Sequence, residues 1–98
     1  MENIDFKSGE ILYDEFHVDF SKTFSEQLDS LTEDLLQVKY GKGCLLDMGW
    51  YPEYEPDGRF VVQLIKSENW DEPEYRRNCR SQEELKEILE FAINLACE

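Results

Sequence analysis

The sequence predicts an α+β fold, in which a three-stranded antiparallel meander packs with an N-terminal and a C-terminal amphipathic helix. Apolar residues recur at intervals of three or four over residues 21–39 and 82–96, which is the spacing of one helix face. Apolar and polar residues alternate over residues 44–51, 59–66 and 74–80, as in strands that bury one face. Two such helices and such a sheet can bury one another's apolar faces.

The first predicted helix rests on an apolar stripe and on signals at its two ends. Thr23 and Glu26 have the spacing of a capping box, in which each side chain satisfies a backbone N–H of the first turn. Gly41 and Gly43 follow the segment and suit a C-terminal cap. The stripe consists of Phe20, Phe24, Leu28, Leu31, Leu35 and Val38.

Residues 1–19 give no single prediction. Phe16, Val18 and Phe20 alternate with polar neighbours, which favours a short strand. A first helical turn is the competing interpretation of this segment.

The remaining elements follow from turn and capping signals. Pro56 presets φ and Asp57–Gly58 tolerates a tight turn, so the strands 44–51 and 59–66 are expected to form a hairpin. The third strand, 74–80, is polar, which suits an edge strand where charge discourages stray pairing. Ser81 and Glu84 have capping-box spacing at the start of the last helix.

Length and composition favour one soluble domain, residues 1–98. The chain has 98 residues, 41% of them hydrophobic, which permits a modest core without metal or disulfide support. No segment approaches the roughly 18 apolar residues of a membrane span, and the first residues do not resemble a secretory signal. The three cysteines, Cys44, Cys79 and Cys97, are widely spaced and odd in number, so we expect free thiols in the cytoplasm.

Negative charge is the strongest feature of the composition. The formal net charge is -13, and it is concentrated in residues 1–38 and 81–98, whereas residues 39–80 are close to neutral. Such a surface repels nucleic acids and anionic membranes, so we expect the chain to contact neither directly. It would speed association with a basic protein partner.

No catalytic or cofactor motif stands out. The segment 40–43, "YGKG", lacks the spacing of a phosphate-binding loop. His17 lies between Asp14, Glu15 and Asp19, and a metal cluster could be imagined there, but the spacing matches no metal signature and a solvated histidine is expected. We therefore predict no metal, no cofactor and no enzymatic activity.

Aromatic and acidic residues near the predicted hairpin are the candidate binding residues. Tyrosine and tryptophan supply contact area, and carboxylates pair with a partner's lysine or arginine. Trp50 is instead expected to fill the core. The candidate partner-binding residues are Glu26, Asp29, Glu33, Asp47, Tyr51, Glu53, Tyr54, Glu55, Asp57, Trp70, Asp71 and Glu72.

The segment "LLDMGWYPEYEPDGRFVVQLIKSENWDEPEYRRNCRSQEELKEILEFAI" resembles the core of small acidic bacterial immunity proteins from contact-dependent growth inhibition and polymorphic toxin systems. The matching features are "D-x-G-W-Y-P", "P-D-G-x-F", "W-D-x-P" and "S-x-E-E-L", over residues 45–93. The resemblance implies a non-enzymatic inhibitor that forms a one-to-one complex with a cognate toxin's C-terminal domain and blocks its active site or substrate surface. Many such toxins are basic nucleases.

Two alternatives to an immunity protein remain open. The first is another acidic binding module, such as a nucleic-acid mimic that inhibits a different basic partner. The second is an enzyme that uses the acidic surroundings of His17.

Overall fold

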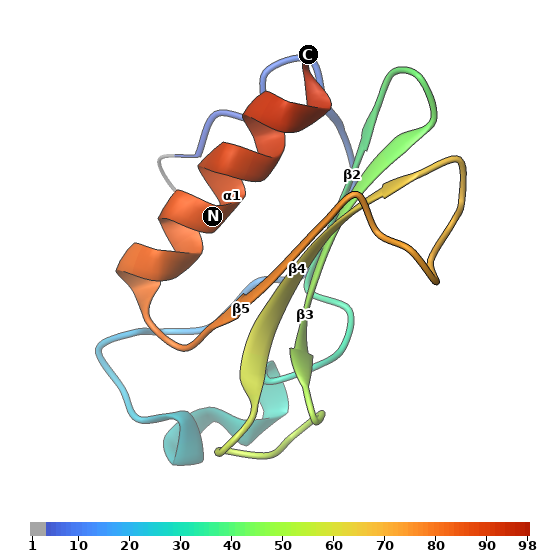
Figure 1. Cartoon of the computed structure of the whole chain (residues 1–98). Coiled ribbons are helices and arrows are strands. Elements are labelled where there is room, and N and C mark those ends of the chain that lie inside the picture. The colour runs from blue at the N-terminus through green and yellow to red at the C-terminus, as the bar shows by residue number, and fades with distance from the viewer. Residues whose placement is uncertain (1–3) are drawn as a thin grey trace.

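The computed structural model describes residues 4–98. It contains one antiparallel sheet with the strand order β1-β2-β3-β4-β5, so that each strand pairs with its neighbour in sequence. Helix α1 lies across one face of this sheet (Figure 1). The elements are β1 Glu10–Asp14, the 3-10 helix η1 Phe24–Ser30, β2 Leu36–Tyr40, β3 Cys44–Tyr51, β4 Arg59–Lys66, β5 Tyr75–Cys79 and α1 Gln82–Ala96.

The predicted fold class is wrong. The sheet has five strands rather than three, and within residues 4–98 no N-terminal amphipathic helix packs on it. Residues 21–39 divide into η1, which is interrupted at Gln27 by non-helical dihedral angles of φ -142° and ψ 42°, and strand β2. In β2 the buried residues Leu36, Val38 and Tyr40 alternate with more exposed ones, so the period is two.

The C-terminal half of the chain follows the predicted element bounds. Strands β3 and β4 span the predicted residues, β5 is slightly shorter than the predicted third strand, and α1 has the predicted bounds. The Ser81 side chain accepts a hydrogen bond from the Glu84 backbone N–H at the start of α1. In the uncertain N-terminal segment the strand is residues 10–14, and Phe16, Val18 and Phe20 lie in the connection that follows it.

The core lies between the sheet and α1. The paired rows Leu36–Met48–Val62 and Val38–Leu46–Leu64 cross β2, β3 and β4 in register. Full burial of each such side chain contributes about 1.5–3 kcal/mol to folding. The helix contributes its apolar stripe to this layer: Leu85, Leu89, Ala92 and Ile93.

An aromatic cluster fills the same layer beyond the start of α1. Trp50 is fully buried, as predicted, with its ring centroid 4.8 Å from that of Phe60 and 4.6 Å from that of Phe24. Its indole Nε1 donates a hydrogen bond to the Glu55 carbonyl oxygen at 2.8 Å, which fixes the β3–β4 hairpin loop to the core. The 3-10 helix η1, which lies in the segment predicted as one long helix, thus packs Phe24 over this end of the core.

The N-terminal segment closes the core beside β2. The Tyr40 hydroxyl donates a hydrogen bond to the Phe6 carbonyl oxygen at 2.9 Å, and the Lys7 ammonium donates to the Asn94 side chain on α1. Burial raises the pKa of the Tyr40 phenol to about 12.

Among the described residues, no helix combines the length and the apolar character needed to cross a membrane.

Candidate functional site

The face of the sheet opposite α1 is the candidate site, and we call it the open face. Successive side chains of a strand point to opposite faces, so the strand register assigns this face. A row of five polar side chains crosses all five strands on it: Tyr13, Gln37, Asp47, Gln63 and Arg76. The chain therefore places polar groups at the centre of the face that α1 does not cover.

Asp47 is the buried charge of this row. Asp47 is only 4% exposed, and its Oδ1 accepts a hydrogen bond of 3.0 Å from the Gln37 Nε2. Burial raises the pKa of the Asp47 carboxyl above its ordinary value, and the nearby charge of Asp34 adds to the effect. A carboxyl in this position costs folding free energy when it is ionised.

Glu33 and Asp34 lie on the open face, in the segment that leads into β2. The Trp50 N–H donates to the Thr32 carbonyl oxygen at 2.8 Å, and the Leu35 N–H donates to the Met48 carbonyl oxygen at 3.0 Å. Between these bonds the backbone of Glu33 lies against Gly49, where the Cβ of any other residue would overlap the Glu33 carbonyl oxygen.

The carboxylate of Glu53 holds residues 32–35 in place where this segment crosses β3 at Gly49. The Glu53 Oε2 accepts a hydrogen bond of 3.0 Å from the Glu33 backbone N–H. The side chains of Glu33 and Asp34 remain exposed at the surface. The crossing segment thus presents two acids beside the buried carboxyl of Asp47.

Two tyrosines complete the group. Tyr51 is 36% exposed, and burial raises the pKa of its phenol, with further increases from Asp47, Glu33 and Asp34. Tyr13 is 40% exposed, and the pKa of its phenol is raised by desolvation and then by the charges of Glu15 and Asp34. We call Tyr13, Glu33, Asp34, Asp47 and Tyr51 the acidic–aromatic patch.

The structure brings together only some of the predicted binding residues. Glu33, Asp47, Tyr51 and Glu53 meet on or beside the patch. Sequence reasoning missed Tyr13 and Asp34; the unpredicted strand β1 places the first, and the adjacent Glu33 was a signal for the second. Tyr54, Glu55 and Asp57 lie in the nearby loop between β3 and β4 (Figure 1).

The other predicted residues lie elsewhere. Glu26 and Asp29 are exposed on η1, and the Glu26 carboxylate accepts hydrogen bonds of 2.9 Å from the Thr23 N–H and hydroxyl, which lower the pKa of that carboxyl. The loop between β4 and β5 lies at the opposite end of the sheet (Figure 1). It carries Trp70, Asp71 and Glu72, all of them exposed.

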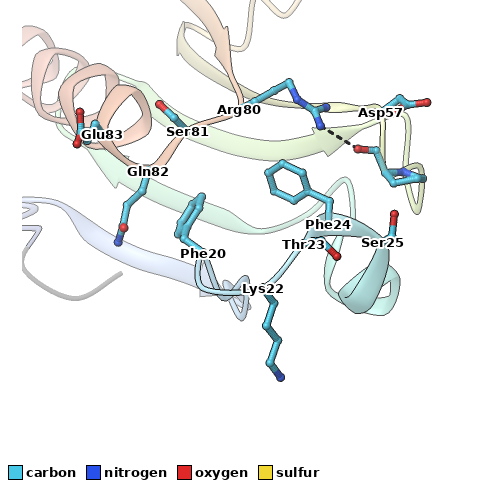
Figure 2. Close-up of a pocket in the computed structure, with 11 residues that line it drawn as sticks. Phe20, Lys22, Thr23, Phe24, Ser25, Asp57, Arg80, Ser81, Gln82 and Glu83 are labelled. Atoms are coloured by element: carbon cyan, nitrogen blue, oxygen red, sulfur yellow. Dashed lines mark hydrogen bonds between the residues drawn. The ribbon is translucent and has the colours of Figure 1, made fainter.

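A hollow of about 690 Å³ lies between the start of α1, η1 and the β3–β4 loop (Figure 2). Its cation, Arg80, is engaged by the protein: the guanidinium donates to the Pro56 carbonyl oxygen at 3.1 Å and to that of Gly58, and lies 4.9 Å from the Phe24 ring centroid. Lys22 points away from the other lining residues (Figure 2). Arg80 therefore fixes the β3–β4 loop to the start of α1, and its guanidinium is already bound within the protein.

His17 lies at the surface. Its Nε2 is 2.9 Å from the Glu15 Oε2, and both side chains are exposed. Within residues 4–98 no three histidine, cysteine or acidic side chains are grouped so that they could hold a metal ion.

Comparison with protein-family models, curated proteins and solved structures finds no match to this chain. Exposed carboxylates and phenols on a rigid sheet can accept hydrogen bonds from lysine and arginine side chains and pack against their apolar stems.

Proposed function

We propose that this protein is a cytoplasmic immunity protein that binds a basic toxin domain through the acidic–aromatic patch and thereby neutralises it. The observation that carries the proposal is the position of the patch: Glu33, Asp34, Asp47 and two tyrosines share the one sheet face that α1 leaves open.

The physical basis is electrostatic mimicry of a polyanion. A nuclease surface is basic because its substrate carries closely spaced phosphates. Carboxylates held on a sheet can occupy the lysines and arginines of such a surface, and a net charge of -13 accelerates the encounter. The tyrosines add aromatic contact area, which is enriched at the centres of protein interfaces.

The buried carboxyl of Asp47 supports a binding role rather than a structural one. Its ionised form is disfavoured in the isolated protein because Asp47 is 4% exposed, and the hydrogen bond from Gln37 does not offset the cost of burial. A guanidinium or ammonium placed above the patch would stabilise the ionised form. The resemblance of residues 45–93 to immunity proteins supports a toxin domain as the partner.

Co-expression tests this proposal. The chain is produced together with the C-terminal domain of the protein encoded by the adjacent upstream gene, and cell survival with and without the chain and co-purification are measured. We expect survival and a one-to-one complex whose association rate falls as ionic strength rises. A toxin that kills cells despite abundant folded inhibitor would overturn the proposal.

Paired charge reversals locate the surface. Glu33→Lys with Asp34→Lys should weaken the complex at least tenfold, because each reversal replaces an attraction with a repulsion. Glu87→Lys with Glu90→Lys makes the same change in net charge on exposed positions of α1 and serves as the matched control. Equal losses from both pairs would show that only total charge matters and would remove the patch from the proposal.

A further inference from the structure

Strand β1 is the most exposed element of the sheet. All five of its residues are exposed, and three consecutive large apolar residues, Ile11, Leu12 and Tyr13, are 50%, 51% and 40% exposed. β1 is also the last strand in the sheet order, and no strand lies beyond it among residues 4–98. An edge strand with this composition is a template for pairing with another extended segment.

The two edges of the sheet differ in chemistry. The opposite edge strand, β5, carries Arg76 and Arg77, and charged side chains are the usual means by which an edge avoids further pairing. In β1 the apolar run lies between the acids Glu10 and Asp14, with Glu15 directly after it. Only the β1 edge therefore combines apolar contact area with negative charge.

The open face is hollowed on both sides of Leu12. One hollow of about 480 Å³ is lined by Leu12, Leu45 and Glu68 among others, and its surface is mostly apolar. A second hollow of about 360 Å³ is lined by Leu12, Tyr13, Asp34 and Gln37. The first offers space to an apolar side chain, and the second places a basic side chain beside the carboxylate of Asp34.

We propose that β1 is a strand-addition site, at which an extended basic segment from the partner pairs with β1 beside its bulge at Leu12. Residues two positions apart in that segment share a face, so an apolar and a basic side chain with this spacing are directed toward the two hollows beside Leu12. This inference rests on the proposed function, because the partner is the same basic protein. It adds a main-chain contact to the charge contacts of the acidic–aromatic patch, which shares Tyr13 and Asp34 with this edge.

Charge complementarity selects this occupant over a second copy of the chain. Two copies would each bring a net charge of -13, and their β1 strands, each with an acid at both ends, would repel one another. A basic segment meets the opposite charge at the same positions.

The test uses isotopically labelled protein and a synthetic basic peptide of about seven residues, long enough to span β1, in which a valine and a lysine stand two positions apart and so share one face. Binding is followed by amide chemical shifts and hydrogen exchange. We expect slowed exchange at β1 amides and shifts at Leu12, Tyr13 and Asp34. A peptide of the same charge with proline at its centre should bind at least tenfold more weakly, since proline removes a donor and disfavours the paired strand.

Two lysine substitutions provide the protein control. Leu12→Lys should lower the peptide affinity about tenfold, because lysine at an edge discourages pairing. Phe91→Lys makes the same charge change at a residue that is 57% exposed on α1, and it should leave the affinity within about twofold.

The outcomes separate this inference from the proposed function. Shifts confined to Glu33, Asp47 and Tyr51, or equal binding of the proline peptide, would overturn strand addition and leave the patch as the toxin-binding surface. Peptide pairing at β1 together with failure of the co-expression test would support the site and overturn only the toxin as partner. Concentration-dependent dimerisation that Leu12→Lys abolishes would overturn the inference in favour of a second copy.

Discussion

The backbone of Glu33 lies directly against Gly49 on the open face of the sheet, at the place where any other residue would carry its Cβ. This contact lets the chain cross β3 before it enters β2, with hydrogen bonds from Trp50 to Thr32 and from Leu35 to Met48 on either side. It thereby sets the position of Glu33 and Asp34 relative to Asp47. A packing requirement at one glycine thus controls the geometry of the acidic–aromatic patch.

Replacement of this glycine should damage stability and binding together. Gly49→Ala forces the Glu33 carbonyl oxygen away from the sheet, and we expect a loss of about 1–3 kcal/mol in the free energy of unfolding, measured with chemical denaturant. The displaced acids should also weaken the toxin complex. Gly41→Ala is the matched control, because its Cβ would meet no atom within 4 Å, and its stability should be close to that of the wild type. Unchanged stability of Gly49→Ala would contradict this account of the crossing.

The Asp47 carboxyl should oppose folding at neutral pH. Its pKa is raised in the folded state, so between the ordinary value of 3.8 and the folded value the folded protein binds more protons than the unfolded chain. Stability attributable to Asp47 therefore falls as pH rises through that window and stays low above it. Asp47→Asn, which keeps an oxygen for the Gln37 amide, should be more stable than the wild type at pH 7.

The pH dependence gives the control for this prediction. The stability advantage of Asp47→Asn should disappear below about pH 3.8, where Asp47 is protonated in both states. Toxin binding by Asp47→Asn should nevertheless be weaker, since the variant cannot become negatively charged. A variant that is less stable than the wild type at pH 7 would show that the ionised carboxyl has a stabilising partner.

The C-terminal half of the fold was predictable because its signals are local and agree with one another. The alternation in β3 and β4, the turn at Asp57–Gly58 and the cap at Ser81 each depend on neighbouring residues. The helix predicted for residues 21–39 was wrong because buried leucines such as Leu31 and Leu35 fit two patterns. They suit one face of a helix, and they equally suit a buried segment that leads into a strand. Only pairing of β2 with β3, which joins Leu36 to Met48 and Val38 to Leu46, decides between them.

The candidate site was predictable only in part for the same reason. The sequence identified Glu33, Asp47, Tyr51 and Glu53 by residue type. Their meeting depends on the crossing over Gly49 and on the register of β2, which no local pattern encodes. Tyr13 joins them because β1 pairs with β2 and places it opposite Gln37.

The three thiols should differ strongly in reactivity. Cys44 and Cys79 are buried, and burial raises the pKa of the Cys79 thiol to about 11, whereas Cys97 is exposed. At pH 8 we expect a colorimetric disulfide reagent to modify one thiol of the native protein rapidly and the other two only after unfolding. Cys97→Ser should remove the rapid phase. Rapid modification of two or three thiols in the native wild type would contradict the burial of Cys44 and Cys79.

Tyr40 should make stability fall at alkaline pH. Its hydroxyl donates to the Phe6 carbonyl oxygen, and its pKa is raised from 10.0 to about 12, so the folded state holds the phenol proton that the unfolded chain loses. Stability from this group is fully present below pH 10 and is lost as pH rises toward 12, by about 2–3 kcal/mol.

Substitution isolates that contribution. Tyr40→Phe leaves the Phe6 carbonyl oxygen without this donor, so we expect a loss of about 1 kcal/mol at pH 7. The difference between wild type and variant should shrink above pH 10 and reverse by about pH 11, because the linkage loss of the wild type then exceeds the advantage of about 1 kcal/mol. Tyr54→Phe, at a residue that is 52% exposed, is the control and should follow the wild type across the whole range. If Tyr40→Phe keeps a constant difference from the wild type up to pH 12, then the Tyr40 phenol ionises without resistance, and the N-terminal segment does not close the core beside β2.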